Sequence, residues 1–219
     1  MKAAASGVLC VLALMIGTVR ADAAPVLVTD PTLFVGLTTV DFEDIVVPPG
    51  GTVPITNQYA AKNLLFSAGL HTDTSFPALA PAILGTVAAT NGDPGCCPSI
   101  TMSFPGGGAR KVGLDIVTLD AAVTGFDIFA LLGGVSTHVG TLGFDSSLEI
   151  KFVGILADAI DPTAKFDSVM ITTLLAPGVT SGFIIDNIRY ELVPEPATLT
   201  LLGLGLAGIA ARARRMRRR

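Results

Sequence analysis

The chain is poor in the side chains that carry most binding and catalytic chemistry. It has no tryptophan and only two tyrosines, Tyr59 and Tyr190. Sugar-binding sites commonly stack ligand rings on exposed aromatic side chains, so this shortage leaves little material for such a platform. Histidine is equally scarce, with His71 and His138 alone, and no Gly-x-Ser-x-Gly motif is present. The composition therefore disfavours an enzyme.

Cysteine occurs three times, in positions that do not suggest zinc. Cys96 and Cys97 are adjacent, whereas Cys10 lies in the N-terminal apolar segment, and no Cys-x-x-Cys or Cys/His spacing is present. In an oxidising compartment we expect the adjacent pair to be oxidised. A bond between neighbours is strained, because consecutive Cα atoms lie about 3.8 Å apart and disulfides prefer about 4.4 Å or more. A locked loop is the simpler interpretation; a redox switch or links between chains are the alternatives.

The N-terminus has the pattern of a signal peptide. Lys2 precedes an apolar stretch from Val8 to Val19, and Ala21 and Ala23 supply the small residues that signal peptidase reads. We predict a signal peptide over residues 1–23, inserted through the Sec translocon and cut after Ala23. A cut one residue later and a permanent N-terminal membrane helix are the alternatives.

The C-terminus, residues 194–219, has three parts in a fixed order. Pro194, Glu195 and Pro196 come first, and an uncharged apolar run from Ala197 to Ala211 follows. The last part is a cluster of Arg212, Arg214, Arg215, Arg217, Arg218 and Arg219. As a helix the apolar run would span roughly 22 Å, which suffices for a bilayer core of about 30 Å if the arginines snorkel to the interface. The cationic flank would hold this end in the cytoplasm. A plain tail anchor and a buried helix with a basic nucleic-acid arm are the alternatives.

This order of parts resembles the PEP-CTERM sorting signal of Gram-negative bacteria. That signal is processed by an exosortase, a membrane-embedded transpeptidase similar to cysteine proteases. The resemblance implies export, transient anchoring in the inner membrane and cleavage near Pro194–Pro196. It further implies delivery to the cell surface or to an extracellular polysaccharide matrix. It specifies an address for the protein and no activity.

Residues 24–193, between the two ends, form an acidic body of the length of one domain. They hold six Lys or Arg residues against sixteen Asp or Glu residues, a net charge of −10. Such a surface repels nucleic acid, which is therefore not an expected partner, and it suits divalent cations. The body is rich in Val, Ile, Thr, Phe and Gly, with turn residues every 8 to 12 positions. This pattern predicts an all-β fold, a two-layer antiparallel β-sandwich. The predicted strands are 38–42, 64–67, 83–88, 100–104, 111–119, 125–132, 136–142, 148–153, 168–175 and 182–192.

Several short runs carry a second, looser resemblance. Val40–Asp44, Ile55–Ala60 and Leu65–Ser67 are similar to the opening of many PEP-CTERM proteins, and Phe183–Ile188 is similar to their closing strand. The same runs resemble jelly-roll carbohydrate-binding modules, whose first and last strands lie side by side. The resemblance implies a jelly-roll-like version of the sandwich.

Asp186 is the most informative single residue of the body. Strand alternation places it on the apolar face of the last strand, with Ile188 and Tyr190. A buried carboxylate must be neutralised, hydrogen-bonded or bound to a metal ion. Jelly rolls of the resembled kind often bind a structural Ca²⁺ through such an aspartate, which implies Glu43 and Asp44 as further ligands, with main-chain carbonyls completing the shell. The alternative is a β-bulge, made credible by the asparagine that follows, in which Asp186 accepts backbone hydrogen bonds.

These observations predict an exported protein with a structural or adhesive role in an exopolysaccharide or biofilm matrix. Its expected partners are signal peptidase, an exosortase, the inner membrane and an exopolysaccharide. A calcium-dependent carbohydrate-binding module is the alternative, and a secreted hydrolase is a distant third. Calcium is the one cofactor that we expect.

Overall fold

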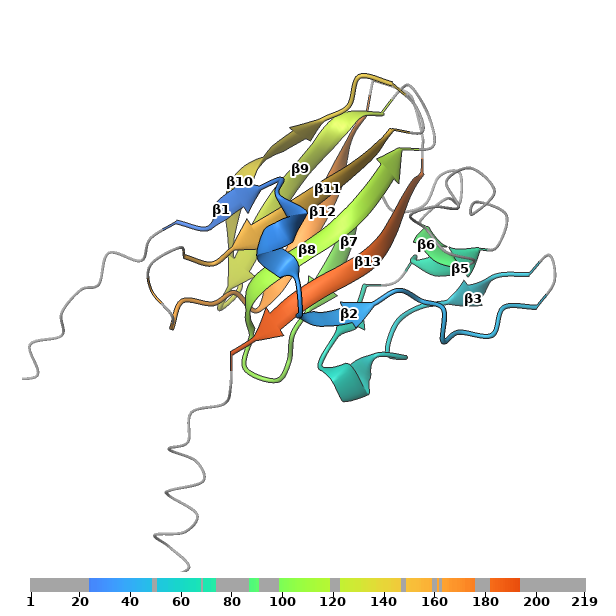
Figure 1. Ribbon diagram of the computed structural model, residues 1–219, viewed down its shortest axis with the longest axis horizontal. Helices are drawn as coiled ribbons and strands as arrows, with labels where there is room; N and C mark the ends of the chain where they lie inside the picture. Colours follow the sequence, from blue (N-terminus) through green and yellow to red (C-terminus); the bar gives the residue numbers. More distant parts are fainter. Residues whose placement is uncertain are drawn as a thin grey trace, which may run out of the picture.

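The structure is a computed structural model of the chain. It describes residues 24–48, 51–67, 69–73, 87–90, 99–118, 123–146, 149–158, 161, 163–175 and 182–193. Within these ranges the strands form two antiparallel sheets stacked face to face (Figure 1). The predicted all-β, two-layer antiparallel sandwich is therefore confirmed. The predicted signal helix and transmembrane helix lie outside the described residues, and no helix in the described ranges is long and apolar enough to cross a membrane.

The larger sheet contains eight of the described strands. Seven form a row in the order β1-β11-β8-β13-β6-β5-β3, and β2 pairs with β13 beside that row. Their bounds are β1 (Val26–Val28), β2 (Thr38–Val40), β3 (Val53–Pro54), β5 (His71–Asp73), β6 (Ala88–Thr90), β8 (Ala109–Thr118), β11 (Ile150–Leu156) and β13 (Phe183–Leu192). The last strand in the sequence, β13, is thus central, flanked by β8 on one side and by β6 and β2 on the other.

The smaller sheet has five strands in the order β10-β9-β12-β7-β4. Their bounds are β4 (Leu65–Phe66), β7 (Ser99–Ser103), β9 (Val123–Leu132), β10 (Val135–Gly143) and β12 (Ser168–Leu175). Two short 3₁₀ helices, η1 (Pro31–Phe34) and η2 (Ala60–Lys62), interrupt the N-terminal part of the chain. Asp30 caps η1 by accepting a 2.9 Å hydrogen bond from the Thr32 backbone N–H.

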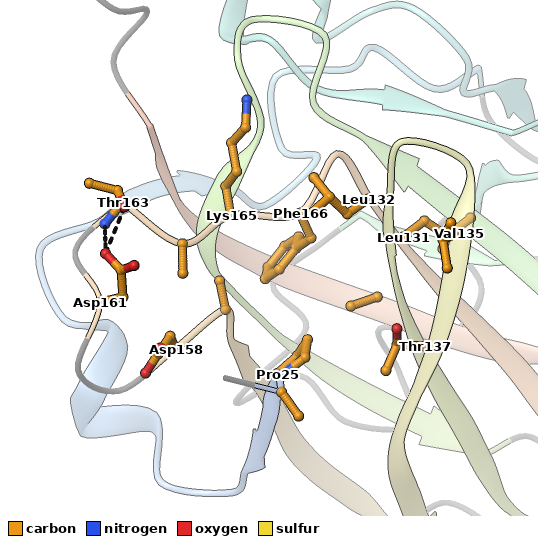
Figure 2. Close-up of a pocket in the computed structure, with 14 residues that line it drawn as sticks. Pro25, Leu131, Leu132, Val135, Thr137, Asp158, Asp161, Thr163, Lys165 and Phe166 are labelled. Carbon is orange, nitrogen blue, oxygen red and sulfur yellow. Dashed lines mark hydrogen bonds between the residues drawn. The ribbon is translucent and has the colours of Figure 1, made fainter. Parts of the chain in front are cut away.

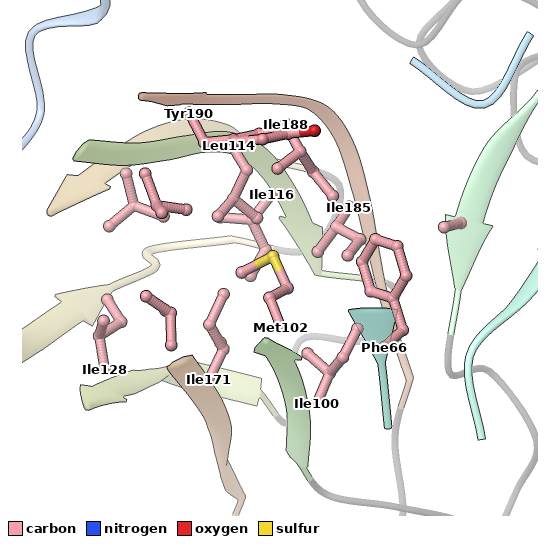
Figure 3. Packing of buried hydrophobic residues seen from close by; sticks show 14 of the residues in the cluster. Phe66, Ile100, Met102, Leu114, Ile116, Ile128, Ile171, Ile185, Ile188 and Tyr190 are labelled. Carbon is pink, nitrogen blue, oxygen red and sulfur yellow. The ribbon is translucent and has the colours of Figure 1, made fainter. Parts of the chain in front are cut away.

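The core lies between the two sheets, as Figure 3 shows. Side chains alternate along each strand, so that Ile100 and Met102 of β7 point inward while the residues between them point to the other face. From the opposite layer, Leu114 and Ile116 of β8 meet them. Ile185 of β13 belongs to the same cluster. Each large apolar side chain buried in this way stabilises the fold by roughly 1.5–3 kcal/mol.

The outer face of the larger sheet is covered in part by η1. Phe34 packs edge-on against Phe152 of β11, with 5.2 Å between ring centroids. The sheet beneath the Phe34 ring carries two glycines, Gly113 and Gly154. A Cβ atom at Gly154 would lie 2.6 Å from Phe34 Cε2, so the ring occupies space that glycine alone leaves open.

A β-bulge interrupts β13 and reverses its alternation. The register with β8 shifts between Asp186 and Arg189, and Asn187 has a positive φ of 49°. Ile185 lies in the main core before the bulge and Ile188 after it. Asp186 is therefore on the outer face of the sheet, and its predicted place on the face of Ile188 is wrong, because the bulge inserts one extra residue.

Candidate functional site

The bulge in β13 lies where the strand changes its neighbour. β6 pairs with Ile184 and Ile185 before the bulge, and β2 pairs with residues 188–190 after it. The chain leaves β2 through Phe42, whose φ is 60°. The predicted calcium ligands, Glu43, Asp44 and Asp186, belong to this junction of β2, β6 and β13.

Carboxylates gather at this junction. Asp186 is 1% exposed, and it is the register partner of Asp115 on β8. Burial, together with the charges of Asp115, Asp41 and Glu43, raises the pKa of Asp186 to about 8. Asp186 Oδ1 accepts a 2.6 Å hydrogen bond from the Asn187 backbone N–H, which offsets part of that rise. The side chain is therefore largely protonated at neutral pH.

Asp115 has a cationic neighbour. Burial raises its pKa, and the Arg189 guanidinium, with Nη2 3.5 Å from Asp115 Oδ2, acts in the opposite direction. Arg189 also lies 5.4 Å from the centre of the Phe152 ring. Of the opposed pair, Asp115 is thus the better placed to carry the negative charge and Asp186 the better placed to carry the proton.

Of the other two predicted calcium ligands, the structure places Glu43 within electrostatic reach of Asp186. The charge of Glu43 acts on Asp186, while Glu43 Oε1 accepts a 2.9 Å hydrogen bond from the Val87 backbone N–H. Asp44 instead accepts a hydrogen bond from the Tyr59 hydroxyl and lies 3.9 Å from Lys62 Nζ. The β-bulge considered as the alternative from the sequence is present, with Asp186 bonded to its backbone.

Among the described residues, no three His, Cys, Asp or Glu side chains are arranged to hold a metal ion. The predicted calcium site differs from such a group, because main-chain carbonyls would complete a shell of only two carboxylates. Calcium binding therefore stays a prediction. The sequence reasoning missed Asp41 and Asp115. Asp115 could have been found, because it is one acidic residue within the otherwise apolar run Leu114–Val117.

A pocket of about 600 Å³ opens at another place, between the edges of the two sheets (Figure 2). Leu131, Leu132 and Val135 of the β9–β10 hairpin form one wall, and Pro25 near the start of β1 lies opposite. The polar side contains Asp158, Asp161, Thr163 and Lys165. These residues were not predicted as a site, because the segments that contribute them are far apart in the sequence.

The two histidines lie on different sheets. His71 is in β5 of the larger sheet, and His138 is in β10 of the smaller one. His138 Nε2 lies 3.1 Å from Asp127 Oδ1, and its ring lies 5.1 Å from that of Phe129. These side chains belong to the outer face of the smaller sheet, where hydroxyl side chains are frequent. The register places Thr101, Met170, Phe129 and His138 in one row across this face, and Ser99, Thr172, Asp127 and Thr141 in the next.

The sorting tail begins where the last strand ends. β13 ends at Leu192, and the Val193 backbone N–H donates a 3.0 Å hydrogen bond to the Gly108 carbonyl. The predicted cleavage motif, the arginine cluster and the three cysteines all lie outside the described residues.

Comparison with protein families identifies this tail. The model of one family, described as the PEP-CTERM protein-sorting motif, matches residues 192–215. The chain carries a PEP-CTERM motif. The motif implies an exported cell-surface protein that is sorted and processed by an exosortase. It also accounts for the arginine cluster without a nucleic-acid arm.

No curated protein matches the PEP-CTERM chain. Its sandwich is distantly similar to several solved structures. The K2 cleaved adhesin domain of Lys-gingipain is 11% identical, with 71% of this chain and 99% of that one covered and a TM-score of 0.40. A family 11 carbohydrate-binding module of the Clostridium thermocellum cellulase Lic26A-Cel5E is 16% identical, with 73% and 96% covered and a TM-score of 0.36. A mutant of the carbohydrate-binding module CBM29-2 is 15% identical, with 50% and 77% covered and a TM-score of 0.35. TM-scores this low carry no conclusion about the chain.

Proposed function

We propose that this protein is exported, cut by an exosortase and released as a structural or adhesive component of an exopolysaccharide or biofilm matrix. One observation carries the proposal: the match to the sorting motif begins at residue 192, the last residue of β13. β13 is the central strand of the larger sheet, and Phe183, Ile185, Ile188 and Tyr190 are part of the core. Cleavage near Pro194 would thus release a sandwich that keeps every strand of the described ranges.

The position of β13 also suits export in an unfolded state. Because the last strand in the sequence pairs with β8, β6 and β2, the larger sheet cannot be completed before residue 192 is available. The body would then fold on the outer side of the inner membrane while its tail is still anchored. A non-catalytic role agrees with the separation of His71 and His138 on different sheets.

A calcium-dependent carbohydrate-binding module is the second candidate. Three acidic side chains favour it: the charges of Asp115, Asp41 and Glu43 add to the larger effect of burial in raising the pKa of Asp186. Glu43 and Asp186 would hold the ion together with main-chain carbonyls, and Ca²⁺ would neutralise the buried charge there. The Ser and Thr side chains in the two rows on the outer face of the smaller sheet would supply hydrogen bonds to a sugar.

One set of assays on purified mature protein separates the candidates. The matrix role predicts binding to the exopolysaccharide of the producing cell, with no hydrolysis of it. The carbohydrate-binding module predicts binding to defined glycans on an array, which is lost in chelator. Release of reducing ends from any glycan tested would reject both and favour the hydrolase.

A further inference from the structure

The two ends of the described chain leave the sandwich at the same end. Pro25, at the start, lines the pocket together with Leu132 and Val135 of the β9–β10 turn. Val193, at the finish, follows directly on β13. Antiparallel pairing of β13 with β8 places Leu192 opposite Ala109, and Ala109 in turn pairs with Phe166 beside the pocket.

A row of hydrogen bonds joins the exit point of the tail to the β9–β10 turn. The Val193 N–H donates to the Gly108 carbonyl, and Ala109 and Phe166 exchange two backbone hydrogen bonds of 2.8 and 2.9 Å. The next residue, Asp167, donates its backbone N–H to the Leu131 carbonyl at 2.7 Å. The turn is therefore fixed in position relative to the exit of the chain.

Asp167 also holds the turn itself, because its Oδ2 accepts a 2.8 Å hydrogen bond from the Gly133 backbone N–H. Gly133 and Gly134 have φ values of 58° and 83°, the conformation of a two-residue hairpin turn in which both residues require positive φ. A Cβ at either glycine would meet no atom within 4 Å, so the tip of the turn projects freely from the protein.

Three exposed apolar side chains lie at this end, beside the polar side of the pocket with Asp158, Asp161 and Lys165. Leu132 and Val135 flank the two glycines and are 45% and 68% exposed, and Val26 of β1 is 45% exposed. Val26 pairs with Leu156, which places it next to the pocket at this end of the larger sheet. We call Val26, Leu132 and Val135 the tether face.

The tail is short between the sandwich and its apolar run. From Val193 to Ala197 there are four residue steps, which span at most about 14 Å when fully extended. If the run from Ala197 crosses the bilayer, as the proposed function requires, the end of the sandwich that carries the tether face is held close to the lipid surface.

We propose that the tether face rests on the interfacial region of a zwitterionic bilayer for as long as the tail is anchored. The inference rests on the proposed anchoring of the tail and adds the surface through which the folded body meets the membrane. Exposed apolar side chains gain free energy by entering the interface, and the net charge of −10 on the body disfavours anionic lipid. Exosortase cleavage would then free a face that had been covered.

The absence of tryptophan allows a direct test with the full chain. Val135→Trp places the one indole of the chain on the tether face, and Asp145→Trp is the matched control, since the Asp145 side chain is 97% exposed. Val135 begins β10, a strand of nine residues, and Asp145 lies just beyond its other end at Gly143, so the two positions are roughly 30 Å apart. Each variant is reconstituted into phosphatidylcholine vesicles with or without bromine on the acyl chains. We expect the indole emission of the Val135→Trp chain to be largely lost in brominated vesicles and that of the Asp145→Trp chain to be retained.

The outcomes distinguish this inference from the anchoring on which it rests. Full chain that fails to float with the vesicles would overturn both. Full chain that floats while the emissions of both variants stay equal would overturn the tether face and leave the anchor intact. Quenching in the Val135→Trp chain that depends on protein density instead of on bromine would show that a second copy covers the face. As a further variant, Leu132→Glu in the Val135→Trp chain should reduce the quenching by bromine, whereas Ser136→Glu should reduce it less.

Discussion

Asp115 on β8 and Asp186 on β13 are register partners, so two carboxylates lie side by side on the outer face of the larger sheet. Two adjacent buried carboxylates resist ionising together, and each raises the cost of charging the other. Arg189 contacts Asp115, while Asp186 has the backbone of its own bulge as a partner. The proton of the pair is therefore expected on Asp186.

The first prediction is that the folded protein loses stability as the pH rises from about 4 to about 8. The pKa of Asp186 is raised in the folded state, to about 8, so folding takes up a proton across this window. Stability is fully present below the unfolded pKa and declines as the pH approaches the folded pKa. Between pH 5 and pH 7.5 we expect this group to account for a loss of roughly 3 kcal/mol, or about 6–12 °C in melting temperature.

Thermal melts of the mature body at a series of pH values would measure this loss. Asp186→Asn, which resembles the protonated side chain, should remove most of the pH dependence. Asp115→Asn should move the transition to lower pH, because the charge of Asp115 raises the pKa of Asp186. A wild-type melting temperature that stays level across the window would contradict the prediction.

The sequence predicts the strands of this sandwich well where alternation is long and undisturbed, and poorly elsewhere. β12 coincides with the predicted segment 168–175, because the β-branched residues Val169, Ile171 and Thr173 recur at every second position. β1, β3 and β5, of two or three residues, leave no period to detect and were missed, whereas the equally short β2 and β4 were found only inside the longer predicted segments 38–42 and 64–67. Their pairing depends on neighbours that are distant in the sequence.

The candidate site shows a similar limit. The sequence identified Asp186 and the option of a bulge, but strict alternation assigned Asp186 to the wrong face. One inserted residue is enough to reverse every side chain beyond it. Asp115 lies beside Asp186 because of the register between β8 and β13. That register cannot be predicted from the order of residues in the sequence. The pocket has the same origin, because it is assembled from segments that the chain order keeps apart.

The second prediction concerns calcium. If Ca²⁺ binds Glu43 and Asp186, it stabilises the folded state by about 2.7 kcal/mol at a hundredfold excess over Kd, or roughly 5–10 °C. Calcium must displace the proton of Asp186, so the shift should be larger at pH 8.5 than at pH 6. Melts with calcium or chelator would show it. Glu43→Gln and Asp186→Asn should abolish the shift, whereas Asp44→Asn should leave it, because Asp44 is bonded to Tyr59. Wild-type melts that are the same with calcium and with chelator at both pH values would show that the protein has no calcium site here.

The third prediction concerns the cysteines of the mature chain. If Cys10 leaves with the predicted signal peptide, Cys96 and Cys97 remain, and we expect no free thiol in exported protein. Alkylation of the unreduced, denatured protein followed by mass measurement tests this. Two added labels per chain would be the contrary result, and a dimer that reduction dissolves would favour links between chains.

The fourth prediction uses two glycines as a matched pair. Gly154→Ala places a Cβ 2.6 Å from Phe34 Cε2 and should destabilise the fold by roughly 1–3 kcal/mol through overpacking. Gly143→Ala is the control, because a Cβ there meets nothing within 4 Å. It should be neutral or slightly stabilising. Urea unfolding of both variants gives the comparison, and equal losses would show that η1 does not pack on the sheet as described.

The last prediction is that the sorting tail acts first as an anchor and then as a cleavage site. With the matched motif starting at residue 192, the precursor should fractionate with the inner membrane, and the mature form should lose everything after the Pro194 region. Deleting Arg212–Arg219 should reduce membrane retention, because the cationic flank that keeps this end in the cytoplasm is gone. Replacing Pro194 and Pro196 by alanine should leave retention unchanged and stop cleavage, which separates the anchor from the processing site. Membrane fractionation and intact-mass measurement of the shed protein provide the two readouts. Shed protein that still carries residues 197–219 would rule out processing. Because the Val193 N–H is bonded to the Gly108 carbonyl, such protein would also keep an apolar segment next to its tether face.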